Sequence, residues 1–222
     1  MTTSRGPELR SESFAPAFRE SIVRSGYNGL RRLVFSGIEA DNIATQLAER
    51  DVFKAVGFEA SRATVMSPQM SQFRVIHFAT HGLIDTEHPE LSSLVLSLVD
   101  EDGKQQDGWL RLHDVYNLDL NAELVVLSAC QTALGREVKG EGLIGLTRGF
   151  MYAGAERVVA SLWSVQDNAT AELMKFFYAN MLGEKHLPPA AALRAAQLEM
   201  LKNSNKRAPC FWAGFVLQGD WR

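Results

Sequence analysis

Two reactive side chains stand at the ends of two apolar segments, as cysteine nucleophile chemistry would require. Residues 73–82 read FRVIHFATHG and end on His81 and Gly82, and residues 123–130 read ELVVLSAC and end on Cys130. Such near-continuous apolar runs are typical of strands buried on both faces of a parallel sheet. Open α/β sheets do their chemistry beyond the carboxyl ends of their strands. His81 and Cys130 could therefore meet at one sheet edge, with the imidazole as general base for the thiol.

The residue after the histidine would help to complete such a site. Gly82 has no Cβ, so its N–H could face a developing oxyanion, with the N–H of Cys130 as the second donor. The alternative is structural, because a free cysteine usually packs in the core and a histidine in an apolar run is usually a hydrogen-bonded core residue. The placement of both residues at strand ends favours catalysis.

Other polar residues near the pair are weaker candidates. His77 shares a strand face with His81 but lies about 13 Å back along the strand, so we interpret it as a buried structural histidine. Asp85, Asp114 and Glu141 could orient His81, and none of the three is convincing as a third member. No group of residues has the spacing of metal ligands, and we expect neither a metal nor a cofactor.

The elements that must position these residues alternate between strands and helices. We expect strands at 31–37, 73–82, 94–99, 109–112, 123–130, 157–163 and 211–217, and helices at 39–49, 142–153, 168–182 and 190–202. In the first helix Ile43 and Leu47 should face inward. Gly154 should end the helix before it, and DEDG (100–103) should form a turn. This alternation predicts an α/β fold with a mostly parallel sheet.

Composition sets limits on partners and location. The chain has 222 residues, 46% of them hydrophobic, which suits one domain with a full core. A net charge of −3 gives no basic footprint, so we do not expect nucleic acid as a direct partner. Two cysteines suit a reducing compartment, the start is polar and unlike a signal peptide, and no apolar run reaches membrane-spanning length. A cytoplasmic protein without membrane contact is the expectation.

Six blocks in fixed order resemble the CHAT domain, a caspase-like cysteine peptidase domain associated with tetratricopeptide repeats. They are HFATHG (77–82), LSSLVLSL (91–98), DGWLRLHDVYNLDL (107–120), LVVLSACQTALG (124–135), GEGLIGLTRGFMYAGAERVVASLWSVQDNAT (140–170) and FWAGFVLQGDWR (211–222). The resemblance runs from about Arg32 to the end of the chain. It implies a caspase–hemoglobinase-like α/β/α sandwich with a mostly parallel central sheet, and its catalytic positions match His81 and Cys130. We accordingly divide the chain into a partly flexible N-terminal extension (1–30), where Phe14, Phe18 and Ile22 have helical spacing, and a peptidase domain (31–222).

The resemblance also implies where a substrate would bind. Caspase-like enzymes hold an extended peptide alongside the strand that here ends at Trp163, so Ser161 and Trp163 would line the cleft. Asp167 would reach the pocket for the residue before the cut and favour Arg or Lys there. The alternative for Asp167 is structural, because it precedes NATAELMKFF and could be the N-cap of that helix.

The resemblance implies a cysteine endopeptidase that cleaves a specific partner protein. The expected setting is a bacterial immune or programmed cell-death pathway, with a gasdermin-like pore former or a regulator as substrate. The alternative is a non-catalytic interaction module, or a latent protease that needs a repeat-containing sensor or regulatory partner. The chain itself shows no 34-residue helical period.

Overall fold

A four-stranded sheet forms the centre of the protein in the computed structural model, which describes residues 20, 33–48, 51–85, 88–128, 130–131, 141–202 and 205–221. Its strands, in spatial order, are β1 (Val75–Phe78), β5 (Leu124–Leu127), β7 (Arg157–Ser161) and β8 (Phe215–Gly219). The first three run parallel, and β8 is antiparallel to β7. The sheet is thus mostly parallel, as predicted, and all four residues of β5 are buried, as expected of a strand covered on both faces.

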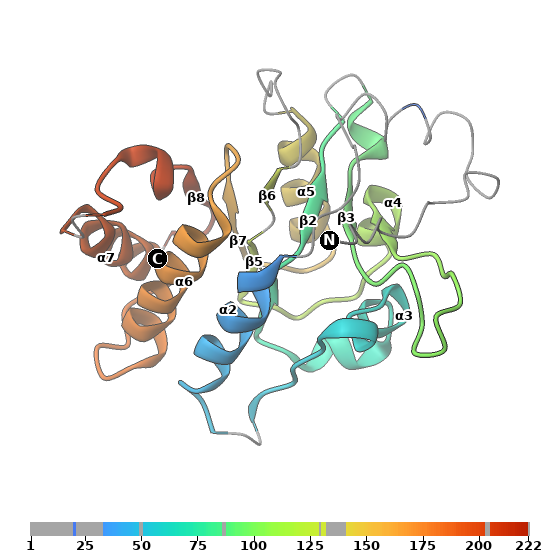
Figure 1. The fold of residues 1–222 in the computed structure, drawn as a ribbon, viewed down its shortest axis with the longest axis horizontal. Helices are drawn as coiled ribbons and strands as arrows, with labels where there is room; N and C mark the ends of the chain where they lie inside the picture. Colours follow the sequence, from blue (N-terminus) through green and yellow to red (C-terminus); the bar gives the residue numbers. More distant parts are fainter. Residues whose placement is uncertain are drawn as a thin grey trace, which may run out of the picture.

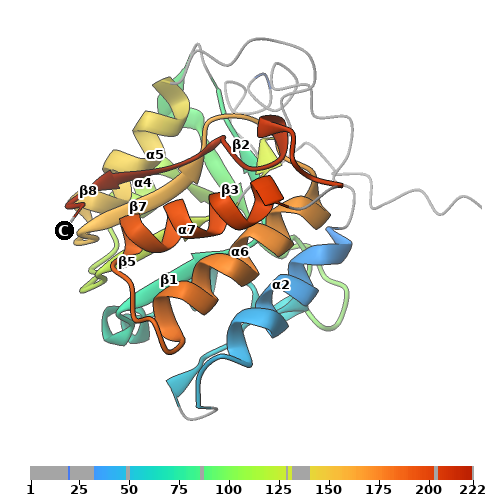
Figure 2. The same ribbon diagram turned by 90° about the vertical axis from the view of Figure 1, so that its left-hand side faces the viewer.

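Helices cover both faces of this sheet (Figure 1, Figure 2). On one face lie α2 (Val34–Ala44), α6 (Asp167–Leu182) and α7 (Pro189–Lys202), and on the other lie α4 (Leu112–Tyr116) and α5 (Glu141–Tyr152). Alternate residues of β5 serve the two layers: Leu124 and Val126 pack with the α6–α7 cluster, whereas Val125 and Leu127 pack with Phe150 of α5. This period of two builds the expected α/β/α sandwich.

The two segments that carry His81 and Cys130 are each broken into two strands. We predicted single strands over 73–82 and 123–130, but the chain leaves the central sheet after Phe78 and after Leu127. In both places the chain then enters a second sheet, whose strand order is β4-β3-β2-β6. The strands of that sheet are β2 (His81–Leu83), β3 (Ser93–Val95), β4 (Trp109–Arg111) and β6 (Cys130–Gln131). The Thr80 hydroxyl donates to the Val95 carbonyl, so this break is held against β3.

The predicted first strand is wrong. Residues 31–37 were expected to be extended, but helix α2 begins at Val34, and Gly37 lies within it. A short apolar run such as LVF does not distinguish strand from helix. The helix predicted at 39–49 is also shifted, because α2 ends at Ala44: Ile43 packs against the α6–α7 cluster as predicted, whereas Leu47 lies beyond the helix and is exposed.

Most of the later elements agree with the sequence to within a few residues. Helices α5, α6 and α7 each begin one residue before the predicted start. Gly154 follows α5 with φ of 111°, and a Cβ there would collide with the Leu120 carbonyl, so the helix ends where only glycine fits. Strand β8 begins at Phe215 and not at 211, because Pro209–Phe211 form a 3₁₀ turn.

Smaller elements complete the description. Helix α3 (Arg62–Val65) and the 3₁₀ turns Gly57–Glu59, Pro68–Gln72 and Pro89–Leu91 lie in the connections. The predicted turn at 100–103 is present: Gly103 has φ of 76°, and its N–H donates to the carbonyl of Asp100 at 3.0 Å. Of the N-terminal extension 1–30, only Glu20 belongs to the described residues, so the expected helix around Phe14, Phe18 and Ile22 falls outside them.

Candidate functional site

The backbone register brings His81 and Cys130 together. Strands β2 and β6 run parallel and pair His81 with Cys130 and Gly82 with Gln131. Neighbouring strands lie about 4.8 Å apart, so the two candidate catalytic residues are direct cross-strand neighbours at the start of their strands. Strands β1 and β5, which precede β2 and β6 in the same two chain segments, are also parallel neighbours. The same two chain segments therefore pair twice, once in each sheet, and the second pairing opens on His81 and Cys130.

Three candidate residues share one offset from the central sheet. Phe78 pairs with Leu127, and Leu127 pairs with Ala160. His81, Cys130 and Trp163 each lie three residues beyond these positions on three adjacent parallel strands. The carboxyl ends of parallel strands meet at one edge, so the predicted dyad and the predicted substrate strand come from the same edge of the sheet.

His81 is half-buried at this edge, and Gly82 is fully buried. Gly82 occupies the middle of β2, where it pairs with Leu94 on one side and with Gln131 on the other. The side chain of Cys130 lies outside the described part of the structure, so the dyad and the two proposed oxyanion donors, Gly82 and Cys130, remain predictions at the level of side chains.

Trp163 is held beside the last strand by contacts that the sequence did not suggest. Its indole Nε1 donates to the carbonyl of Cys210 at 3.1 Å, and the buried hydroxyl of Ser161 donates to the Trp163 carbonyl at 2.7 Å. A Cβ on Gly214 would lie 2.7 Å from the Ser161 hydroxyl and 2.9 Å from the indole. The Ser161 hydroxyl is thus engaged in a bond within the chain, while Trp163 as a whole is 38% exposed.

Asp167 is neither the N-cap of its helix nor free of intramolecular contacts. The cap position of α6 is Gln166, whose side chain makes no capping bond, and Asp167 is the first helical residue. The N-cap alternative is therefore off by one residue. One carboxylate oxygen of Asp167, Oδ2, accepts the backbone N–H of Phe35 in the first turn of α2 at 2.9 Å. No feature of the local sequence points to this partner, 132 positions away.

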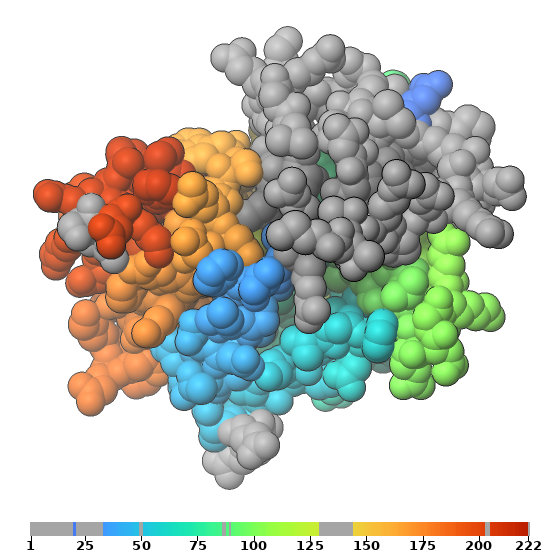
Figure 3. Space-filling model, in the orientation of Figure 1, coloured from blue at the N-terminus to red at the C-terminus, as the bar shows by residue number. Residues whose placement is uncertain are grey.

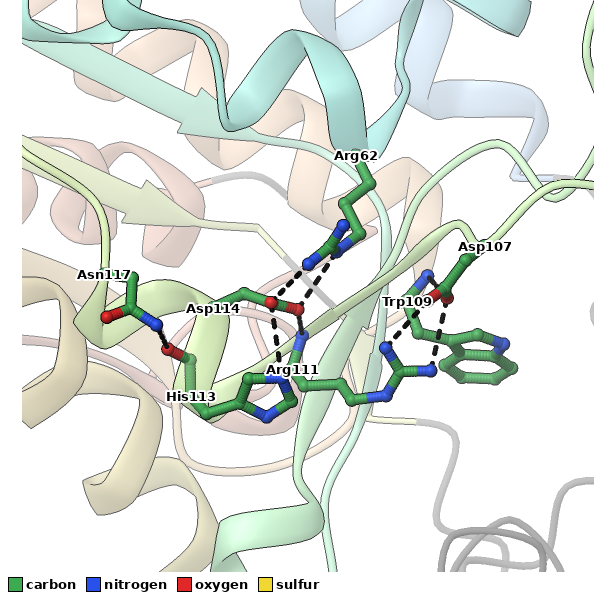
Figure 4. A network of polar contacts seen from close by, with 7 residues as sticks. All are labelled: Arg62, Asp107, Trp109, Arg111, His113, Asp114 and Asn117. Atoms are coloured by element: carbon green, nitrogen blue, oxygen red, sulfur yellow. Dashed lines mark hydrogen bonds and ion pairs between the residues drawn. The ribbon is translucent and has the colours of Figure 1, made fainter. Parts of the chain in front are cut away.

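Asp114, one of the candidates to orient His81, belongs to a different network (Figure 4). Its buried carboxylate accepts two bonds from the Arg62 guanidinium, at 2.5 and 3.1 Å, and one from the backbone N–H of Arg111 at 3.0 Å. Burial alone would raise the pKa of Asp114, but the bonds from Arg62 and Arg111 outweigh it and lower that pKa. Asp114 therefore anchors α3 to the start of α4.

The other two candidates to orient His81 are Asp85 and Glu141. Asp85 is buried in the loop after β2 and accepts the backbone N–H of His88 at 2.9 Å. Its own N–H donates to the hydroxyl of Ser92 at 3.1 Å. Glu141 opens α5, and its side chain lies outside the described part.

His77 is the centre of a buried polar chain, which supports its structural interpretation. Its Nε2 lies 2.7 Å from Oε1 of Glu39, and its Nδ1 lies 3.0 Å from the hydroxyl of Tyr178. Burial and, to a lesser extent, the charge of Glu39 raise the pKa of Tyr178. A carboxylate can only accept, so Nε2 donates to Glu39, and Nδ1 makes the second bond with the Tyr178 hydroxyl. Spacing within one strand could not reveal Glu39 of α2 or Tyr178 of α6.

Two features are absent from the described residues: a metal-binding cluster and a membrane-spanning helix. Among them, no group of three or more His, Cys, Asp and Glu side chains could hold a metal ion. Within the same part of the chain, none of the helices has the length and apolar character needed to cross a membrane.

Comparison with known proteins agrees with this arrangement. The family model described as "CHAT domain" matches residues 15–220. The human protein named "Tetratricopeptide repeat protein 28" is 32% identical over 74% of this chain, and the mouse protein of that name is 31% identical over 74%. In each case the match spans only 8% of the relative's own length. Both relatives are thus long proteins named for tetratricopeptide repeats. With a mostly parallel sheet between two helical layers and a family match over nearly its whole length, this chain belongs to the CHAT domain family, which is caspase-like.

Proposed function

We propose that this chain is a cysteine endopeptidase in which His81 and Cys130 form the catalytic dyad. The observation that carries the proposal is the parallel pairing of His81 with Cys130 at the start of β2 and β6. Residues paired in this way project to the same face of a sheet. The family is caspase-like, and that plan uses a thiol nucleophile with a histidine as its base.

The chemistry follows from the two side chains. His81 accepts the proton of the Cys130 thiol, and the thiolate attacks the carbonyl carbon of the scissile peptide bond. The N–H groups of Gly82 and Cys130 would stabilise the resulting oxyanion. When the C–N bond breaks, His81 gives its proton to the leaving amine, and an acyl-enzyme remains. Water, activated by His81, then attacks the thioester, releases the carboxylic acid product and restores the thiol.

The pairing of β7 limits where an extended substrate can lie. Within the described residues, β7 is paired with β5 up to Ala160 and with β8 up to Ser161, and Leu162 bonds onward to Gly214. A peptide can therefore add only beyond Ala160, on the side that β5 leaves after Leu127. The register supports this side, because Ala160, the residue before Ser161, pairs with Leu127, which lies three positions before Cys130. We place the residues before the cut there, in a β-augmentation mode.

The substrate we propose is a specific partner protein. The resemblance described above favours one in a bacterial immune or cell-death pathway, such as a gasdermin-like pore former or a regulator. The names of the relatives favour a domain that works within a longer repeat-containing protein. A repeat-containing sensor or regulatory partner is accordingly proposed, and the alternative function is an interaction module without catalysis.

A peptide probe that alkylates cysteine separates enzyme from interaction module. Cys210 is an exposed free thiol and would react in the background, so the experiment uses Cys210→Ala as its parent. We expect Cys130 to be labelled, with the rate falling at least about 100-fold in His81→Ala, as for the loss of a general base. His113→Ala is the control, because His113 is an exposed histidine on α4. Equal labelling in the parent and in His81→Ala would contradict the dyad.

Cleavage itself gives the second readout. Cys130→Ala and His81→Ala should each abolish peptide hydrolysis while leaving the fold intact. The two residues act as a unit, so the double variant should be little worse than either single one. If His81→Ala kept its activity while a folded His77 variant lost it, the assignment of His81 as the base would be wrong.

A further inference from the structure

Helix α2 is held on the body of the protein by directed polar bonds in addition to packing. Its buried residue is Glu39, and Ile43 near its end packs against the α6–α7 cluster, whereas Val34, Phe35 and Ile38 are 67%, 38% and 47% exposed. In the space-filling view the blue surface of α2 lies against the orange surface of α6 (Figure 3). The exposed apolar residues lie in the first half of α2, so directed bonds matter most for the position of that half.

One of these bonds closes the N-terminus of α2. The N-cap residue of α2 is Leu33, which has no polar side chain to offer. The Asp167 carboxylate instead accepts the N–H of Phe35, the second residue of the helix, at 2.9 Å. The first N–H groups of a helix lack intrahelical partners and carry partial positive charge. Asp167 thus supplies from α6 the cap that α2 lacks.

The same residue ends the segment that carries Trp163. Strand β7 ends at Ser161 and α6 begins at Asp167, so residues 162–166 bridge the two. At the strand end, the segment is fixed by the bond from Leu162 to Gly214 and by the indole bond to Cys210. At the helix end, Asp167 ties it to α2. The placement of Trp163 therefore depends on a bond made by α2.

We propose that Asp167 is a positioning residue, which sets the 162–166 segment and its Trp163 by capping α2, and not a specificity carboxylate that contacts substrate. The kinetic consequence of this role rests on the proposed peptidase function, whereas its structural consequence does not. Loss of the bond should loosen residues 162–166 and weaken substrate binding. It should leave the preference for the residue before the cut unchanged.

The bond can be removed from either side. Asp167→Ala deletes the acceptor, and Phe35→Pro deletes the donor at a first-turn position, where proline is tolerated. Phe35→Ala is the matched control that loses the ring and keeps the N–H. Gly37→Ala is a second control on α2, because a Cβ there meets nothing within 4 Å. Asp167→Asn retains an oxygen that can accept the N–H and should restore wild-type behaviour.

Amide hydrogen exchange of residues 162–166 is the first readout. We expect Asp167→Ala and Phe35→Pro to speed exchange there by similar factors, with the double variant no faster than either single one, because one bond is being removed twice. Both controls and Asp167→Asn should exchange as the wild type. Unchanged exchange in Asp167→Ala or in Phe35→Pro, or additive effects in the double variant, would overturn the proposal.

Peptide cleavage is the second readout. We expect KM to rise several-fold in both Asp167→Ala and Phe35→Pro, with kcat changed less. Loss of cleavage after Arg or Lys in Asp167→Asn, together with normal cleavage by Phe35→Pro, would place the carboxylate at the substrate and overturn the positioning role. A wild-type chain without peptidase activity would refute the proposed function, and the exchange measurements would still decide the role of Asp167.

Discussion

Replacing His77 by leucine should strongly destabilise the fold, because it leaves two buried polar groups without their hydrogen-bond partner. The imidazole bonds Glu39 at 2.7 Å and Tyr178 at 3.0 Å, and Glu39 and Tyr178 are each only 1% exposed. The Glu39 carboxylate would be left as a buried charge without its partner, which costs about 3–5 kcal/mol. The Tyr178 hydroxyl would also lose its partner at Nδ1. We expect a loss of about 3–5 kcal/mol, which is a large part of the 5–15 kcal/mol typical of a domain.

Two comparison variants test where that free energy comes from. Tyr178→Phe removes one neutral donor and should cost only about 1 kcal/mol. The double variant His77→Leu with Glu39→Leu should be more stable than His77→Leu alone, because replacing both polar partners by apolar groups avoids the uncompensated carboxylate. The order of stability should therefore be Tyr178→Phe first, then the double variant, then His77→Leu.

Urea unfolding measures these differences, read from the midpoints of variants that share one m value. A loss below about 1 kcal/mol in His77→Leu, set against the 3–5 kcal/mol expected for a broken buried pair, would show that the Glu39 carboxylate reaches water. A double variant no more stable than His77→Leu would refute the reasoning from buried charge. Labelling of Cys130 by the peptide probe, corrected for the folded fraction, should stay normal in Tyr178→Phe.

Three further outcomes are expected. Gly214→Ala places a Cβ 2.9 Å from the Trp163 indole, so urea unfolding should show a loss of about 1–3 kcal/mol and cleavage assays a raised KM, whereas Gly37→Ala, with an open site, should show neither. The pKa of Asp114 is lowered in the folded protein, so its pairing with Arg62 stabilises the fold fully above the ordinary pKa of 3.8, and this stabilisation is lost as the pH falls through the lower folded pKa. The difference in unfolding free energy between wild type and Asp114→Asn should therefore shrink when unfolding is measured below pH 3.8. Cys210→Ala should keep peptidase turnover, since the exposed residue contacts Trp163 through its backbone carbonyl, and a folded but inactive variant would instead assign its thiol to the site.

The sequence was most informative where structure is local. The buried strand Leu124–Leu127 and the helices α5, α6 and α7 follow from apolar patterning, and Gly154 marks the end of α5 through its backbone conformation. These features depend on residues within one or two turns of each other. The same kind of information pointed to one sheet edge for His81 and Cys130; they open β2 and β6 and do not end the longer strands predicted for them, and the backbone register pairs them.

The sequence failed where distant residues decide the outcome. The LVF run at 33–35 looked like a strand, but Asp167 caps a helix there, and Glu39 of that helix bonds to His77. The break at Ala79 and Thr80 contains no glycine or proline to mark it in the sequence, because it results from the second sheet and from the bond of Thr80 to Val95. Asp167 itself looked like a local cap, and its partner proved to be 132 positions away.

The distant capping of α2 also has a consequence for the order in which the protein takes shape during its synthesis. Isolated helices shorter than about 12 residues are marginal in water, and α2 has 11. The ribosome makes α2 before it makes His77 and Asp167, which bond to Glu39 and Phe35 of this helix. At about 5–20 residues per second, the 132 positions between Phe35 and Asp167 correspond to roughly ten seconds. Helix α2 is therefore made early but takes up its final position late, because its cap is available only after the start of α6 has emerged.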